Sequence, residues 1–397
     1  MTWIAAIGII LICLIFLTWL DFYFGKKHHV KHREKLYFPI SNGHYTLYQS
    51  GSPLFHDMFQ NMKDAKKEIN VQFFIVKRDD ISEQLLKMLE EKTREGLKVR
   101  LLVDRVGGFR LTKDIRYRLR EAGVEFAFSS RPGFPFFLYR LNRRNHRKIA
   151  VIDGETVYVG GFNIGKEYID GNVKFSKWRD YHVRLHGPVA HDFQQVFSLD
   201  WRESAKPIEV YKPQLRRENG EVQVLATDGV GLENSFLQLF SFAKEEIMIG
   251  SPYFVPSRAL VHGLKSAINR GVSVKIMVPM RADHPLVKEG AIPYLFEMKR
   301  VGADVRLYDQ GFFHGKVLII DQKVCDIGTA NFDRRSFFVN KEINVIMYDH
   351  TFIEIAREQF MRDFNASIVL SEKWYQQLSW WTRIIKIPLA KLFRPLL

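Results

Sequence analysis

The second half of this chain repeats the first, and this internal duplication constrains the fold more than any other feature of the sequence. The repeated segments keep their order and a nearly constant offset, so chance is a poor explanation. A chain of 397 residues is also long enough for two domain-sized halves. Three pairs of segments match: residues 65–69 with 243–247, 96–103 with 271–278, and 120–126 with 299–305.

Each repeat alternates helical stretches with short β-branched runs. Residues 82–95 and 256–270 are expected to be helices that lead into strands beginning near Lys98 and Ser273. This pattern predicts an α/β fold in which two βαβ halves, each with a buried sheet, pack as a pseudo-two-fold pair. A polar segment with two prolines marks the boundary. The expected divisions are an anchor (1–24), a basic linker (25–40), the first half (41–205), a linker (206–219), the second half (220–366) and a tail (367–397).

The N-terminal stretch from Met1 to Leu20 contains no charged side chain, and as a helix it spans roughly the 30 Å of a bilayer core. Trp3 and Trp19 stand near its ends, where amphipathic rings prefer the interface. A secretory signal would have basic residues before the apolar run, whereas here the basic cluster follows it. The sequence therefore predicts a transmembrane helix crossing once, with Met1 outside and the rest of the chain in the cytoplasm. The basic residues are Lys26, Lys27, Lys31, Arg33 and Lys35.

The formal net charge of +15 favours an anionic partner, and by itself it does not choose between nucleic acid and anionic lipid. Of the two cysteines, Cys13 lies in the apolar N-terminal run and Cys325 in an expected strand. A disulfide between them is therefore not expected, and neither is a thiolate metal cluster.

The strongest chemical signal is a histidine motif late in each repeat. Both copies have His, Lys, Asp, Gly and Asn at identical internal spacing. A lone His-x-Lys would mean little, but a duplicated set of five residue types indicates a functional site. The first copy is His146, Lys148, Asp153, Gly160-Gly161 and Asn163; the second is His314, Lys316, Asp321, Gly328-Thr329 and Asn331.

The spacing of this motif predicts a hairpin. Residues two apart on a strand share a face, so His146 and Lys148 are expected to point the same way. Four apolar residues then lead to Asp153, in the turn to the next strand. The returning strand brings Asn163 beside His146. If the second copy folds in the same way and faces the first, two histidines, two lysines and two asparagines surround one pocket.

Such a pocket suits transfer at a phosphodiester. One imidazole can attack phosphorus and form a covalent phosphohistidine, which splits a difficult displacement into two easier ones. A second imidazole can protonate the leaving alcohol and then deprotonate the incoming one. Ammonium and amide groups stabilise the charge that grows on the equatorial oxygens. This chemistry needs no metal and no cofactor.

With these paired motifs, the sequence resembles the phospholipase D superfamily, and within it the bacterial cardiolipin synthase branch, particularly the short synthases with one membrane anchor. The resemblance extends from the anchor to about Phe364. The stretches that carry it are residues 131–137, 144–148, 158–164, 251–257, 283–287 and 328–336.

The resemblance implies a role for each motif residue. His146 would be the nucleophile and His314 the general acid and base, although the sequence alone does not order them. Asp153 and Asp321, the third members of the catalytic motifs, would be structural supports and not proton-transfer groups. Four residues would hold the phosphate: Lys148, Lys316, Asn163 and Asn331.

Six further residues would support the site. Asp180 and Glu342 match acidic positions that orient a catalytic histidine through a hydrogen bond. Their distances from the asparagines differ, which indicates an insertion at residues 169–176 in the first half. The others are Gly160, Gly161, Gly328 and Thr329.

Several other residues lie outside the two motifs. His182, His186 and His191 have no repeat partner and are expected to be structural. Asp104 and Asp283 follow apolar strands, where they either touch a lipid headgroup or are ordinary loop residues. The aromatic segment 134–139 and the cationic amphipathic tail 374–397 are expected to contact the membrane, with burial against the body as the alternative.

The favoured function is a cardiolipin synthase at the bacterial cell membrane. It would move a phosphatidyl group between two phosphatidylglycerol molecules to give cardiolipin and glycerol. The partners are thus anionic lipid and the membrane, and no nucleic acid. The alternatives are a phospholipase D-type hydrolase or another phosphatidyltransferase, a nuclease, against which the anchor counts, and an inactive lipid-binding scaffold.

Overall fold

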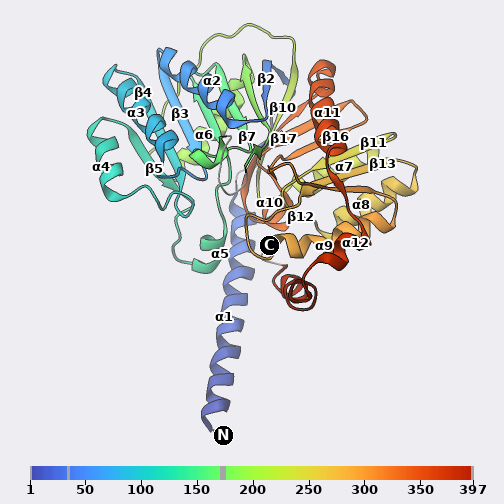
Figure 1. The fold of residues 1–397 in the computed structure, drawn as a ribbon. Coiled ribbons are helices and arrows are strands. Elements are labelled where there is room, and N and C mark those ends of the chain that lie inside the picture. The colour runs from blue at the N-terminus through green and yellow to red at the C-terminus, as the bar shows by residue number, and fades with distance from the viewer. Residues whose placement is uncertain (1, 34–35, 170–175, 395–397) are drawn as a thin grey trace.

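Two sheets with the same strand order form the core of the two halves (Figure 1). The computed structural model describes residues 2–33, 36–169 and 176–394. The first sheet has the order β2-β9-β7-β6-β3-β4-β5, and the second repeats it as β10-β19-β17-β16-β11-β13-β14. In each sheet the last three strands are parallel and the others antiparallel. The expected α/β repeat is therefore confirmed, with mixed sheets.

The strands and helices of the two halves have the following bounds. The first half contains β2 (His44–Tyr48), α2 (Gly51–Asp64), β3 (Glu68–Phe73), α3 (Asp80–Arg94), β4 (Lys98–Asp104), α4 (Lys113–Glu121), β5 (Glu125–Ser129), α5 (Phe137–Asn142), β6 (Ile149–Ile152), β7 (Thr156–Gly160), η1 (Lys166–Tyr168), β8 (Trp178–Arg179), β9 (His182–His186) and α6 (Ala190–Arg202). The second contains β10 (Glu221–Asp228), α7 (Leu232–Phe242), β11 (Glu246–Gly250), β12 (Phe254–Val255), α8 (Arg258–Asn269), β13 (Ser273–Pro279), α9 (Val287–Arg300), β14 (Asp304–Tyr308), β15 (Phe312–Phe313), β16 (Val317–Ile320), β17 (Val324–Gly328), β18 (Phe332–Asp333), α10 (Arg334–Phe338), β19 (Lys341–Met347) and α11 (His350–Asn365).

The duplication extends to the ends of the helices. Asp79 caps α3 by accepting a hydrogen bond from the Ser82 backbone N–H, and Ser257 caps α8 in the same way. Both helices end just before a glycine with positive φ, 93° at Gly96 and 92° at Gly271. The expected helices at 82–95 and 256–270 are thus present within two residues of their predicted bounds.

The two halves share one apolar core. A single cluster joins strands β6, β7 and β9 of the first sheet to β16, β17 and β19 of the second, with side chains such as Val157, Val183, Ile327 and Val345 fully buried. Burial of this apolar surface is the main driving force that holds the halves together. The motif strands of both repeats therefore face each other across the interface.

Short edge segments cross the expected domain boundaries. β1 (Ser41–Asn42) pairs with β10 of the second sheet, so the first sheet begins only at β2. β20 (Ile368–Val369) pairs with β14, which extends the second sheet past residue 366. The rest of the tail forms α12 (Glu372–Gln377), the helical turn η2 (Thr382–Lys386) and α13 (Ile387–Leu392).

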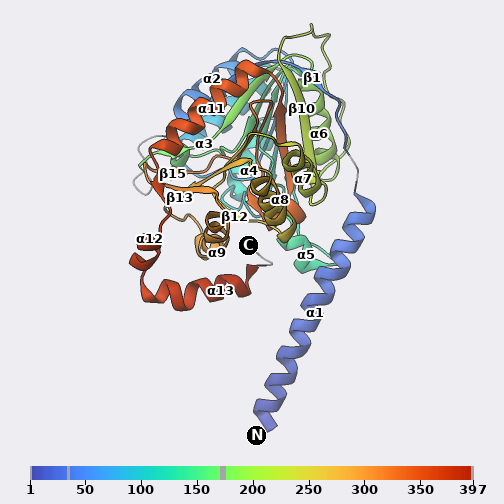
Figure 2. The ribbon, with the colours of Figure 1, turned by 90° about the vertical axis from the view of Figure 1, so that its right-hand side faces the viewer.

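The N-terminal segment is one helix, α1 (Thr2–His32), which leaves the body as a long rod (Figures 1 and 2). The span found in residues 6–32 is long and apolar enough to cross a membrane, with a mean hydropathy of 2.3 over its 18-residue window. The helix continues through Lys26, Lys27 and Lys31, so the basic linker expected from residue 25 is helical up to His32. Lys35 lies outside the described residues.

The inner end of α1 is fixed to the body through α5. The Asp21 carboxylate accepts a hydrogen bond of 2.7 Å from the Tyr139 backbone N–H, and Gly25 packs directly against the Tyr139 ring. His29 and Arg143 both contact Asp228, at 3.3 and 2.6 Å. The N-terminal helix is therefore docked onto the body and is not joined to it by a flexible linker.

The motif aspartates hold turns. Asp153 has a φ of 51° and its carboxylate accepts three backbone hydrogen bonds, from Lys66, Lys67 and Glu68, at 2.7 to 2.9 Å. Asp321 also has a φ of 51° and accepts the equivalent bonds from Lys244, Glu245 and Glu246. Each lies at the far end of its strand from the histidine, so the grouping of Asp153 and Asp321 with catalytic residues is wrong in position. They act as supports.

Replacing Asp153 by alanine is expected to lower the free energy of unfolding by about 2–3 kcal/mol, because three N–H groups lose a charged acceptor and alanine tolerates positive φ poorly. Thermal or denaturant unfolding in detergent measures this. Asp80→Ala is the matched control, since the Asp80 side chain is 94% exposed. Loss of activity in Asp153→Ala without loss of stability would contradict the supporting role.

Candidate active site

Both motif histidines and both motif asparagines line one pocket between the two halves. The pocket encloses about 1410 Å³ including its open mouth, and its walls come from both repeats. The predicted convergence of the duplicated motifs is therefore confirmed for the histidines and asparagines, whereas Lys148 and Lys316 do not line the pocket. The four residues are His146, Asn163, His314 and Asn331.

Each histidine is held by a carboxylate from the other half. His146 Nδ1 lies 2.9 Å from Glu342 Oε2, and His314 Nδ1 lies 2.6 Å from Asp180 Oδ2. A hydrogen bond at Nδ1 fixes the ring and its tautomer and leaves Nε2 for chemistry. The sequence pointed to these two acids, but not to the crossing between halves.

Two short backbone pairings create the crossing. β8 and β15 pair in parallel with Arg179 opposite Phe313, and the next residues are Asp180 and His314. Asn145 forms an equivalent bridge with Lys341, and the next residues are His146 and Glu342. The hydrogen bonds His314 N–H to Arg179 O and His146 N–H to Lys341 O, at 2.7 and 2.9 Å, continue these pairings. Register alone therefore places each imidazole opposite its carboxylate.

The motif glycines and threonine make room for the acids and hold them. A Cβ atom on Gly161 would overlap the Asp180 carboxylate, and one on Gly328 would overlap the Asn344 side chain. The Thr329 hydroxyl donates to Glu342 Oε2 at 2.6 Å, and the Tyr181 backbone N–H donates to Asp180 at 2.8 Å. Gly160, with a φ of 155°, allows close approach of the Tyr181 carbonyl.

The motif lysines lie beneath the histidines, and both are almost fully buried. Lys148 Nζ donates to the His146 carbonyl at 2.7 Å, and Lys316 Nζ lies 2.6 Å from His314 Nδ1. The motif histidines and lysines precede strands β6 and β16. His146 and Lys148 come before Ile149, and His314 and Lys316 come before Val317. The expectation that they lie within the strand is therefore wrong, because the sheet ladder begins only at Ile149 and Val317.

Burial sets the protonation of the site. It lowers the pKa of Lys148 to about 7, an effect that Glu342 opposes, and that of Lys316 to about 8, opposed by Asp180. Burial also lowers the pKa of His146 to about 4, against the attraction of Glu342. The pKa of His314 is lowered by burial and by the charge of Lys316. Both imidazoles are therefore neutral at pH 7 before substrate binds.

The two carboxylates remain ionised. Burial alone would raise the pKa of Asp180, but the charge of Lys316 and the hydrogen bond from His314 hold it below its ordinary value. Burial would also raise the pKa of Glu342. The hydrogen bond with His146 and the charge of Lys148 outweigh burial and hold this pKa below its ordinary value. Each acid can therefore stabilise an imidazolium when one forms.

The asparagines differ in their surroundings. Asn163 Oδ1 accepts a hydrogen bond from the Ile75 backbone N–H at 3.1 Å, and its Nδ2 donates to the Tyr168 hydroxyl at 3.3 Å. The Asn331 backbone N–H donates to Ser336 Oγ at 3.1 Å. Both lie where an amide can meet a phosphate oxygen in the pocket.

The sequence did not reveal a buried charge network behind His146. Arg147 and Lys341 both pair with Asp200, each at 2.8 Å, and all three side chains are buried. Because Arg147 and Lys341 belong to different repeats, this cluster ties the halves together at the base of the site. Only the alternation of Arg147 with His146 and Lys148 hinted at it.

The remaining candidates are now placed. Asp104 is fully buried in an ion pair with Arg144 at 3.1 Å, so of the two alternatives left open by the sequence it takes the structural one, whereas Asp283 lines the pocket. His182, His186 and His191 do not line it. Most of the 169–176 insertion lies outside the described residues. Within the described part of the chain, no group of three or more His, Cys, Asp or Glu side chains could hold a metal.

A two-lobed α/β fold whose halves each bring a His-x-Lys motif to one pocket defines a phospholipase D-like enzyme. The family described as cardiolipin synthase, phospholipase D-like domain, matches residues 58–201 and 236–364. This chain belongs to that cardiolipin synthase family, and it is a phosphatidyltransferase.

Relatives and a solved structure agree with this assignment. The chain is 38% identical to the minor cardiolipin synthase ClsB of Bacillus subtilis over 92% of each chain. It is 35% identical to the major cardiolipin synthase ClsA of the same organism, over 95% of this chain and 82% of that one. The crystal structure of phosphatidylserine synthase from Haemophilus influenzae superposes with a TM-score of 0.69 at 18% identity, covering 94% of this chain and all of that one, which shows the shared fold.

The lysine pKa values predict an alkaline limit on activity. Below pH 7 both lysines are charged, and as pH rises through about 7 and then about 8 Lys148 and Lys316 lose their protons, so kcat/KM should fall. An anionic phosphate raises both pKa values, so kcat should fall at a higher pH than kcat/KM. In Lys148→Arg, the pH at which kcat/KM begins to fall is expected to be higher than in the wild type. A kcat/KM profile that stays flat to pH 9 would contradict the assignment.

Proposed function

We propose that this enzyme transfers a phosphatidyl group from one phosphatidylglycerol molecule to another, giving cardiolipin and glycerol. The observation that carries the proposal is the pair of crossed histidine–carboxylate bonds around one pocket, with a buried lysine beneath each imidazole. The printed names of the two Bacillus subtilis relatives support cardiolipin as the product.

In the first step His146 Nε2 attacks the phosphorus of the donor lipid. A P–N bond forms, the P–O bond to glycerol breaks, and His314 gives its proton to the leaving glycerol oxygen. The depressed pKa of His146, about 4, keeps its lone pair free at pH 7. The negative phosphodiester raises the proton affinity of the neighbouring His314, which can then carry that proton.

In the second step the direction of proton transfer reverses. His314 removes the proton of an acceptor hydroxyl, whose oxygen forms the new P–O bond while the P–N bond to His146 breaks. Lys148, Lys316, Asn163 and Asn331 would stabilise the phosphate oxygens in both steps. Glu342 and Asp180 would stabilise positive charge on His146 and His314.

The body is proposed to lie on the inner face of the cell membrane. Helix α1, helix α5 and the tail segment from α12 to α13 are on the same side of the molecule in both views (Figures 1 and 2). Exposed aromatic and aliphatic side chains cover α5 and the tail next to basic residues, as suits an anionic bilayer surface. The exposed side chains include Phe134, Phe137, Leu138, Leu141, Trp380, Trp381, Ile384 and Leu392.

Purified enzyme and phosphatidylglycerol in detergent micelles test the reaction. Cardiolipin and glycerol should form, and His146→Asn or His314→Asn should lower the rate by at least about 1000-fold. The control is His350→Asn, because the His350 side chain is 69% exposed on α11. Phosphatidic acid without cardiolipin would make the protein a hydrolase instead.

The order of the histidines has its own test. With phosphate-labelled lipid, brief incubation of His314→Asn should leave an acid-labile label on the protein, because the intermediate forms slowly but is discharged more slowly still. His146→Asn should carry no label. Labelling of His146→Asn at His314 would reverse the two roles.

Orientation is tested with an epitope tag added after Leu397. In intact spheroplasts the tag should resist added protease, and in inside-out vesicles it should be cleaved, because the basic residues that follow the span favour a cytoplasmic body. Cleavage in spheroplasts would place the catalytic body outside.

A further inference from the structure

The two walls of the catalytic pocket differ although the motifs repeat. Tyr253, which lines the pocket, occupies the position of Ile75 in the first repeat, because the following residues Phe254 and Val76 make the same pairing beside Asn331 and Asn163. Asp283 lies in the stretch after β13 where the offset between the repeats changes from 175 to 179 residues, so the offset assigns it no single partner in the first half. The second half thus carries a hydroxyl where the first half has an isoleucine, and Asp283 lines the pocket whereas Asp104, which follows the matching strand β4, is paired with Arg144.

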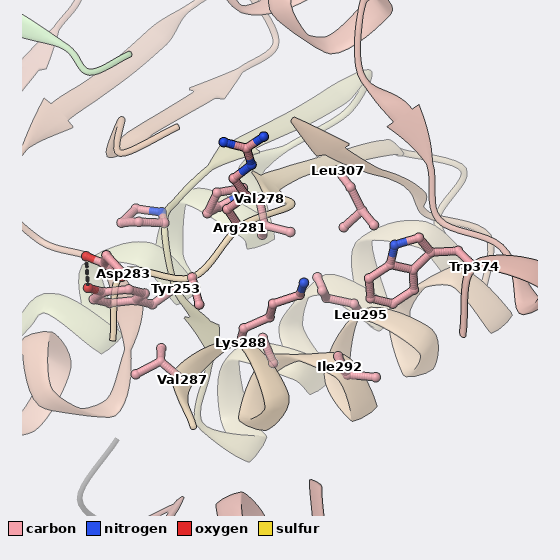
Figure 3. Close-up of a pocket in the computed structure, with 14 residues that line it drawn as sticks. Tyr253, Val278, Arg281, Asp283, Val287, Lys288, Ile292, Leu295, Leu307 and Trp374 are labelled. Carbon is pink, nitrogen blue, oxygen red and sulfur yellow. Dashed lines mark hydrogen bonds between the residues drawn. The ribbon is translucent and has the colours of Figure 1, made fainter. Parts of the chain in front are cut away.

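These two residues form a hydrogen-bonded pair. The Tyr253 hydroxyl donates to Asp283 Oδ2 at 2.7 Å (Figure 3), and Asp283 Oδ1 has no hydrogen-bond partner among the described residues. His284 Nε2 lies 3.8 Å from Oδ2. A carboxylate accepts hydrogen bonds and repels phosphate, so it suits an uncharged donor such as an alcohol.

A side cavity opens from this pair. Tyr253, Asp283 and Val287 line both the catalytic pocket and the side cavity. In the side cavity the Lys288 amine lies between the Tyr253–Asp283 pair and the Trp374 ring, and Arg281 stands on its wall (Figure 3). Apolar side chains, among them Ile292 and Leu295, form the rest. A hydroxyl acceptor, two cations and an apolar surface in series match a phospholipid with an alcohol headgroup.

We propose that this wall binds the acceptor lipid. Asp283, supported by Tyr253, accepts a hydrogen bond from the glycerol headgroup of the acceptor, while Arg281 and Lys288 face its phosphate and the apolar surface takes its glycerol backbone. The bound headgroup presents one hydroxyl to His314, which takes its proton as the oxygen replaces His146 on phosphorus. The donor then uses the first-half wall. This assignment rests on the proposed function and explains how a lipid alcohol is preferred to water.

The partition of products tests the assignment. With phosphatidylglycerol labelled in its headgroup, the pre-steady-state burst of glycerol reports the donor step, and the ratio of cardiolipin to phosphatidic acid reports capture by lipid or water. Asp283→Asn should lower this ratio by about tenfold or more, since a hydrogen bond to a charged group is lost, and should lower the burst much less. Asp80→Asn should change neither.

Two further arms sharpen the result. Tyr253→Phe removes only the supporting hydroxyl and should shift the ratio in the same direction by roughly threefold, which keeps the test open if Asp283→Asn folds poorly. Exchange of free labelled glycerol into phosphatidylglycerol should fall in Asp283→Asn. In Arg281→Gln this glycerol exchange should persist, because the variant weakens only the capture of the lipid acceptor.

The contrary outcomes are distinct. An unchanged ratio in both Asp283→Asn and Tyr253→Phe, or a burst that falls as much as cardiolipin formation, would overturn the acceptor site while leaving the synthase function intact. Wild-type enzyme that releases phosphatidic acid and no cardiolipin would instead overturn the proposed function.

Discussion

The site depends on two carboxylates that cross from one half to the other. His146 is oriented by Glu342 and His314 by Asp180, so neither half by itself contains a histidine together with the carboxylate that orients it. The crossing follows from two short backbone pairings whose register puts imidazole opposite acid. Because these groups are buried, removal of one partner would leave an uncompensated charge. The geometry of the two histidine–carboxylate pairs therefore depends on how the two halves pack against each other.

The shared apolar core and the network of Arg147, Asp200 and Lys341 protect this arrangement. The core fixes the distance between the motif strands, and the network fixes the segment that bears both His146 and its neighbours. Helix α1 docks on α5 through Asp21 and Gly25, which directly precede the basic residues Lys26 and Lys27 of the same helix. Membrane anchor, interface and site thus form one continuous structure.

Duplication supplies symmetry, and the reaction needs asymmetry. In the proposed reaction two identical walls would bind donor and acceptor alike, yet one lipid would lose its headgroup while the other keeps it. The matched motifs place two imidazoles in similar surroundings. The hydrogen-bonded pair of Tyr253 and Asp283 has no counterpart in the first wall of the pocket, and it makes the second wall different. Departures from the repeat therefore indicate where the two substrates are distinguished.

The sequence by itself determined the duplication, the α/β halves, the apolar N-terminal helix, the histidines and asparagines of the pocket and the lysines beneath the histidines, because these are carried by local periodicity and by spacing within each repeat. Only the tertiary structure decided that the acids act across the interface, that Asp104 is sealed by Arg144 while Asp283 faces the pocket, and that the lysines precede the strands. Those features arise from pairings between segments that are far apart in the chain, as Asp180 and His314 are, and no local pattern encodes the register in which such segments meet.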